Sequence, residues 1–115
     1  YIVYKIWHAS GKFIAQRTKT VYNVETNSVN EYLNNIEYII TKITDTQYLI
    51  KQTNLNSGSV VNLLFFKSND IYLSSSDSGI DNLFYNGCGE LIHNWSIPID
   101  TDNNLTNAHA VLYRI

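Results

Sequence analysis

The stretch EYIITKITDTQYLIKQT, residues 37–53, decides the fold class. Residues 37–43 and 47–53 are two short runs rich in isoleucine, tyrosine and threonine, which are enriched in strands. Thr44, Asp45 and Thr46 separate the runs, and a three-residue polar connection is typical of a β-hairpin. The stretch therefore predicts two antiparallel strands joined by a tight turn.

The same succession of apolar runs and turn residues continues in both directions, at spacings of about 8 to 12 residues. Residues 54–58 turn the chain into residues 60–67, the most apolar run, which we expect to form a central strand. Further strands are expected at residues 1–8, 13–22, 71–74, 83–86, 90–95 and 110–115, with a long polar loop at 100–107. About eight strands in 115 residues indicate an all-β fold.

One segment departs from this pattern. Ser28 and Glu31 have the spacing of a capping box, in which two side chains satisfy free backbone amides at a helix start. Apolar side chains follow from residue 29 to residue 36 at spacings of three and four, as on one helical face. We therefore predict a small antiparallel meander that closes into a barrel, with one short helix near residues 28–36. The alternative is an α+β fold with that helix packed on one antiparallel sheet.

Length and charge limit the class of protein. The 115 residues, 44% of them hydrophobic, suffice for one core, so we expect a single domain over residues 1–115. The net charge is −2, and the nearest approach to a basic patch is Lys12, Arg17 and Lys19, which we interpret as a solvated strand face. We therefore expect neither a nucleic-acid partner nor a membrane partner. A soluble protein, secreted or cytoplasmic, fits this composition.

The segment NGCGELIH, residues 86–93, raises the question of a reactive thiol. Cys88, His93 and Glu90 are the residue types of an activated cysteine, its base and an orienting carboxylate. On a strand, however, His93 and Glu90 would point to opposite faces because they are three residues apart. We therefore treat the three as weak catalytic candidates, expect no assembled catalytic set, and keep a Cys88-dependent enzyme as the second alternative function.

No metal site and no cofactor are expected from the sequence. The three histidines have no metal-ligand spacing, and the acidic residues of the polar loops lack the order of ligands found in calcium-binding loops. The glycine pattern of nucleotide-binding turns is also absent, because no third glycine follows Gly87 and Gly89.

The first functional hypothesis is a non-catalytic protein that occupies a partner protein, as an inhibitor, immunity or host-interaction factor does. Nine tyrosines, abundant asparagine and few charges suit a protein contact. We expect the contact in two polar segments, at residues 74–81 and 100–107. The candidate contact residues are Ser76, Asp77, Asp81, Asp102, Asn104 and Asn107.

The first alternative is a barrel that holds a small apolar ligand, with Trp7 and Trp95 lining its mouth. In architecture alone, a small meander of about this length resembles the calycin-type barrels and the compact barrels of bacterial protease inhibitors. No motif of either group can be quoted from this chain, so no functional position is transferred from them.

Overall fold

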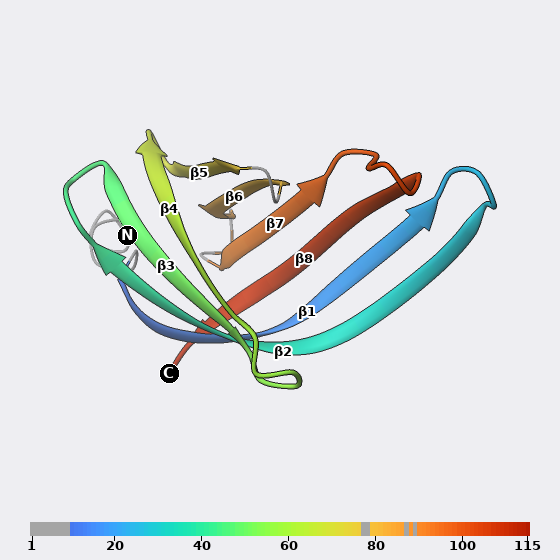
Figure 1. The fold of residues 1–115 in the computed structure, drawn as a ribbon. Helices are drawn as coiled ribbons and strands as arrows, with labels where there is room; N and C mark the ends of the chain where they lie inside the picture. The colour runs from blue at the N-terminus through green and yellow to red at the C-terminus, as the bar shows by residue number, and fades with distance from the viewer. Residues whose placement is uncertain (1–9, 77–78, 87, 89) are drawn as a thin grey trace.

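The structure is a computed structural model that describes residues 10–76, 79–86, 88 and 90–115. In these residues the chain forms eight antiparallel strands (Figure 1). They are β1 (Gly11–Asn23), β2 (Ser28–Lys42), β3 (Gln47–Asn54), β4 (Val60–Ser68), β5 (Ile71–Ser76), β6 (Gly79–Tyr85), β7 (Leu91–Ile97) and β8 (Asn104–Arg114).

Each strand pairs with its neighbours in sequence, and β1 pairs with β8 to close the barrel. That closing pair runs from Phe13 opposite Arg114 to Asn23 opposite Asn104. The prediction of an all-β antiparallel meander that closes into a barrel is thus confirmed. The predicted hairpin is confirmed as well, since β2 and β3 flank the turn at residues 43–46.

The predicted short helix near residues 28–36 is wrong, and so is the α+β alternative, because the described part of the chain contains no helix. Residues 28–36 form the first part of β2, which pairs with β1 along its whole length. Residues 28–33 are all exposed, so the apolar spacing there does not mark a buried helical face. From Ile36 to Ile40 the buried positions alternate, which is the period of a strand. Pairing with β1 therefore overrides the local helix signal.

One other expectation is not tested, and two change. The predicted strand at residues 1–8 lies outside the described residues. The predicted loop at 100–107 is shorter, because β8 begins at Asn104. The run at 60–67 forms β4, but it is not a central strand, and Phe65 is its only buried residue. A closed barrel has no central strand, and β4 exposes apolar side chains along most of its length.

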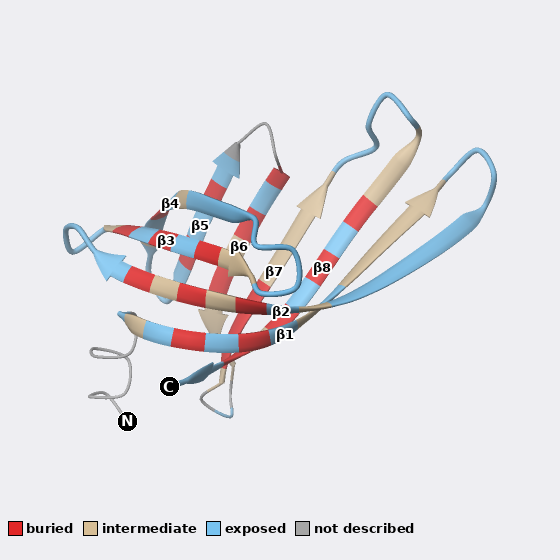
Figure 2. Cartoon of the chain, turned by 60° about the horizontal axis from the view of Figure 1, so that its bottom comes forward, coloured by how far each residue is buried: buried red, intermediate tan, exposed pale blue. Residues whose placement is uncertain are grey.

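The hydrophobic core fills one end of the barrel, where buried and exposed residues alternate along the strands (Figure 2). Every strand contributes at least one inward-facing alanine, isoleucine, leucine, phenylalanine or tyrosine to the core, including Phe65 from β4 and Leu91 from β7. Tyr38 and Phe65 are the largest fully buried side chains. The core therefore closes this end of the barrel with side chains.

The turns at the far ends of the β1–β2 and β7–β8 hairpins lie side by side (Figure 1). The Val24 N–H donates to the Asn103 carbonyl at 2.9 Å, and the Asn23 amide donates to the Asp102 carbonyl and to the Asn104 side chain, each at 3.0 Å. The Asn103 amide in turn donates to the Glu25 carboxylate at 2.9 Å. These bonds tie the two hairpins together beyond the core.

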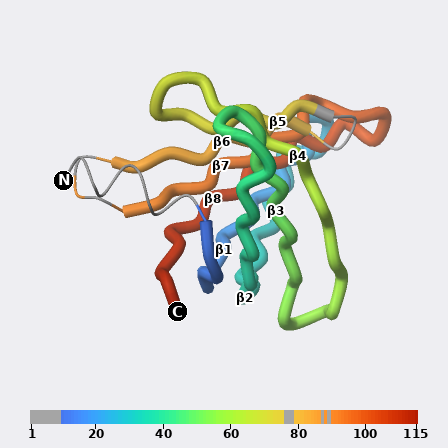
Figure 3. The backbone as a smooth tube through the Cα atoms, turned by 90° about the vertical axis from the view of Figure 1, so that its left-hand side faces the viewer, coloured from blue at the N-terminus to red at the C-terminus, as the bar shows by residue number. Residues whose placement is uncertain are grey.

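The pairing between β4 and β5 is the shortest in the barrel. It covers only three residue pairs, from Phe66 opposite Leu73 to Ser68 opposite Ile71. Residues 60–65 of β4 therefore pair with β3 alone. Figure 3 shows β4 running from the β3–β4 turn towards this short contact with β5.

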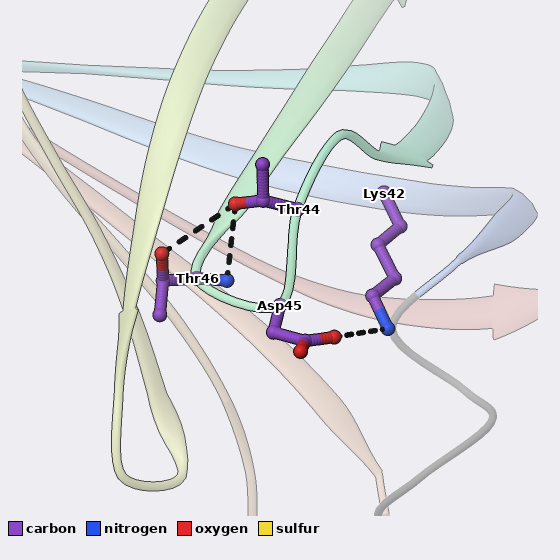
Figure 4. A network of polar contacts seen from close by, with 4 residues as sticks. All are labelled: Lys42, Thr44, Asp45 and Thr46. Carbon is purple, nitrogen blue, oxygen red and sulfur yellow. Dashed lines mark hydrogen bonds and ion pairs between the residues drawn. The ribbon is translucent and has the colours of Figure 1, made fainter.

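The β2–β3 turn is held by its own polar side chains (Figure 4). The Lys42 ammonium binds the Asp45 carboxylate at 2.9 Å, and the Thr46 N–H donates to the Thr44 hydroxyl at 3.3 Å. The hydrogen bond with Asp45 raises the pKa of Lys42, and the same bond lowers the pKa of Asp45. These contacts hold the connection at residues 43–46, which includes the turn residues 44–46 predicted from the sequence.

Candidate ligand site inside the barrel

A chain of three buried polar side chains crosses the barrel interior above the core. The Tyr38 hydroxyl lies 2.8 Å from Nδ1 of His93, and Nε2 of His93 lies 2.7 Å from Oδ1 of Asp81. Tyr38 is 1% exposed, His93 2% and Asp81 3%. They come from β2, β7 and β6, so the chain forms only when those strands share one interior.

The carboxylate fixes the direction of these bonds. An ionised Asp81 can only accept, so Nε2 of His93 donates to it. In the neutral imidazole Nδ1 then accepts the proton of the Tyr38 hydroxyl. Burial raises the pKa of Tyr38 above its ordinary value, although the nearby Arg17 charge opposes this rise. Tyr38 is therefore a protonated donor at neutral pH.

The raised pKa of Tyr38 predicts a loss of stability in alkaline solution. Above pH about 10 the unfolded tyrosine loses its proton while the folded one keeps it, so the free energy of unfolding falls as pH rises. Tyr38 contributes a slope of up to about 1.4 kcal/mol per pH unit. Urea unfolding of the wild type and Tyr38→Phe between about pH 8 and about pH 11 measures this slope. We expect a shallower fall in the variant; equal slopes would contradict this origin.

A cavity of about 180 Å³ adjoins this polar chain, at the end of the barrel that carries the β3–β4 turn. Its apolar lining is Ile36, Val61, Leu63 and the Trp95 ring, and its polar lining is Arg17, Gln52, Asn54, Ser59 and Asp81. Val61 and Leu63 belong to the part of β4 that has separated from β5. The cavity thus begins where the β4–β5 pairing ends.

Two cations lie over the Trp95 ring. The Arg17 guanidinium is 5.6 Å from the ring centroid and the Lys19 ammonium is 5.8 Å from it, distances at which cations are attracted to the ring face. Trp95 and Lys19 are both opposite Ala108 of β8, so only a methyl group separates them across that strand. Small residues on β8 therefore let long side chains of β1 reach β7.

Two donors on the cavity lining have no acceptor among the described residues. Nε of Arg17 and Nε2 of Gln52 are both buried without a hydrogen-bond partner. Gln52 is only 8% exposed. Arg17 also makes no ion pair with a described carboxylate, although Asp81 lines the same cavity. Buried polar groups are normally satisfied, so this pair of donors makes the cavity a candidate binding site for an acceptor.

A larger hollow, about 370 Å³, lies on the outer surface of β1, β6, β7 and β8. Its outward-facing side chains are mainly amides and hydroxyls, including Asn82, Asn94 and Asn107. Oδ1 of Asn82 is buried there without a partner, and the His109 ring binds the Asn94 side chain at 2.7 Å. The interior cavity is the better candidate, because it combines free donors, an unpaired guanidinium and apolar surface.

The residues of the possible thiol site do not assemble. Both ring nitrogens of His93 are engaged inside the barrel by Tyr38 and Asp81, whereas Cys88 is exposed in the β6–β7 turn. The side chain of Asn86 organises this turn: its oxygen accepts from the Cys88 and Glu90 N–H groups, and its amide donates to the Glu90 carboxylate. In the described part of this segment, Cys88 therefore lies in a turn, whereas His93 lies on β7 with its ring inside the barrel.

The predicted partner-contact residues lie in different places. Asp81 is not in a surface turn but inside the barrel, on β6. Asp102 and Asn104 belong to the hydrogen-bonded β7–β8 turn, and Asn107 lines the outer hollow. Ser76 ends β5, and Asp77 lies outside the described residues. Binding of a partner protein through these residues stays a prediction.

Of the two predicted ligand-binding tryptophans, Trp95 lines the interior cavity and Trp7 lies outside the described residues. Arg17, Gln52 and Tyr38 are absent from the sequence-based candidates. A sequence signal for Arg17 exists, because residues 13, 15 and 17 lie at two-residue steps on one strand face, and Phe13 and Ala15 face the core. For Gln52 the equivalent signal is that it shares a strand face with the core residues Tyr48 and Ile50, at two-residue steps.

Within the described residues, no group of three or more histidine, cysteine, aspartate or glutamate side chains is placed to hold a metal ion. A search of the same residues finds no helix with the length and apolar character needed to span a membrane.

No protein-family model, no curated protein and no solved structure matches the chain.

Proposed function

We propose that this chain is a non-catalytic binding protein that holds a small molecule inside its barrel. The observation that carries the proposal is the interior cavity, where free donors on Arg17 and Gln52 face apolar surface from Leu63 and the Trp95 ring. Small-molecule sites typically combine an apolar lining with a few fixed polar groups. The cavity has this composition.

Two further features support binding rather than catalysis. Both ring nitrogens of His93 are engaged in hydrogen bonds, one with Tyr38 and one with Asp81. These bonds order the interior beside the cavity. Cys88, the one nucleophilic thiol, is exposed in a turn and away from that chain. The interior is therefore preorganised around the cavity, and preorganisation lowers the entropy lost on binding.

The test is a screen of small compounds by ligand-observed NMR against the wild type and two variants. Leu63→Phe fills the cavity, while Leu64→Phe makes the same change at the next residue of β4, which is exposed on the outer face. We expect compounds that bind the wild type and Leu64→Phe but bind Leu63→Phe at least about tenfold more weakly, since a filled pocket loses its ligand contacts. The proposal is wrong if no compound binds, or if Leu63→Phe binds as the wild type does.

A further inference from the structure

The free donors of the cavity also specify what the ligand must offer. We infer that the ligand is a small carboxylic acid in its ionised form, whose carboxylate binds Nε of Arg17 and Nε2 of Gln52 while its apolar part contacts Trp95 and Leu63. This inference rests on the proposed function, because it names the ligand class of the same site.

Hydrogen-bond complementarity is the first step. Nε of Arg17 and Nε2 of Gln52 are both donors, both buried, and both without an acceptor among the described residues. Gln52 is more than nine-tenths buried, at 8% exposed, and both residues line the same cavity. They come from β1 and β3, which β2 separates. A carboxylate has two oxygens that only accept, so it can satisfy one donor with each.

Charge is the second step. Arg17 and Lys19 both lie over the Trp95 ring, and neither forms an ion pair with a described carboxylate. The opposing charge on the cavity lining is Asp81, whose Oδ1 already accepts from His93. Arg17 is the one cation on the cavity lining, and Lys19, over the same Trp95 ring, adds a second cation beside it, so two cations stand near one carboxylate and favour an anion with a single charge. A phosphate would bring more negative charge towards the Asp81 carboxylate, which like-charge repulsion disfavours.

Size and polarity are the third step. The remaining lining is largely apolar, from Ile36, Val61, Leu63 and Trp95. The cavity measures about 180 Å³, and an apolar protein cavity of about 150 Å³ accepts one benzene. A single aromatic ring with a carboxylate therefore suits the site, whereas a long-chain fatty acid exceeds it.

The experiment compares two compounds of nearly equal shape, benzoate and benzamide, by NMR titration. We expect the wild type to bind benzoate at least about tenfold more tightly than benzamide, because charge-assisted bonds to guanidinium are the stronger ones. Arg17→Met should remove this preference by weakening benzoate alone, and Gln52→Leu should weaken benzoate several-fold. Arg114→Met is the matched control, because Arg114 lies over Phe13, a core residue outside the cavity lining.

Thermal unfolding of each variant establishes that it is folded before its affinity is compared, and Gln52→Leu replaces Arg17→Met if the latter does not fold. The two proposals fail differently. If benzamide binds as tightly as benzoate and the weakened binding of Leu63→Phe persists, the carboxylate inference is overturned while the proposed function stands. If neither compound binds and the wider screen also finds no ligand, the proposed function is overturned as well.

Discussion

Replacing His93 with leucine should lower the free energy of unfolding by about 3 to 5 kcal/mol, because it breaks a buried polar pair and leaves the other partner unpaired. His93 is 2% exposed and contacts Tyr38 and Asp81 through its two ring nitrogens. Leucine keeps most of the side-chain volume, so the decrease in the free energy of unfolding comes mainly from the lost polar contacts. Urea unfolding followed by circular dichroism measures it.

The second variant in this experiment separates the polar term from packing. His93→Leu combined with Asp81→Leu removes both members of the His93–Asp81 pair and leaves only the Tyr38 hydroxyl without its partner. A buried pair replaced by apolar residues is often close to neutral. We therefore expect the double variant to recover at least half of the loss. His109→Ala is the control, because His109 is exposed and binds Asn94 on the outer surface. A double variant less stable than His93→Leu would show that the two residues do not act as a pair.

Replacing Phe65 with alanine should cost about 3 to 5 kcal/mol, the usual range for a fully buried phenylalanine. Phe65 is 0% exposed and is the only buried residue of β4, although Leu63 also packs partly against the core. Its edge also faces the His93 ring, with the centroids 6.3 Å apart. The substitution therefore affects the core and the middle residue of the polar chain together.

The matched control for this prediction is the neighbouring residue. Phe66→Ala makes the same change on the outer face of β4, where Phe66 is 50% exposed. We expect it to cost about 1 kcal/mol or less, since surface substitutions have small effects. Equal losses at the two positions, measured by urea unfolding, would mean that β4 does not alternate between core and solvent as described.

Strand periodicity explains how much of the fold could be predicted. Residues 37–53 combine strand-forming residues with a polar turn, and both local signals agree with the tertiary structure. At residues 28–36 the local signals disagree with it, because the capping-box spacing and the apolar spacing lie on a strand that β1 pairs throughout. Cross-strand pairing is a non-local term, and a short window of sequence does not contain it.

The site was harder to predict for the same reason. Tyr38 and His93 are 55 residues apart, and only the barrel brings their strands across one interior. From the sequence alone, Arg17 is grouped with Lys12 as a solvated strand face. On β1, however, side chains alternate between the two faces, so Lys12 binds Glu37 on the surface while Arg17 lines the cavity. A polar residue that lies two or four positions from core residues on the same strand faces the interior with them. An interpretation based on charge and composition overlooks this signal.

The closing pair of the barrel has a consequence for the order of folding. Seven of the pairings join strands that are adjacent in sequence, whereas β1 and β8 meet only after a loop of nearly the whole described chain has closed. Closing such a long loop costs conformational entropy before the distant strands can pair, so the pairing of β1 with β8 slows the final step of folding. The cavity needs β1 beside β8 to bring Arg17 over Trp95, so it is completed in that step. A ligand that recognises the finished cavity would then prolong the lifetime of the native state without accelerating its formation.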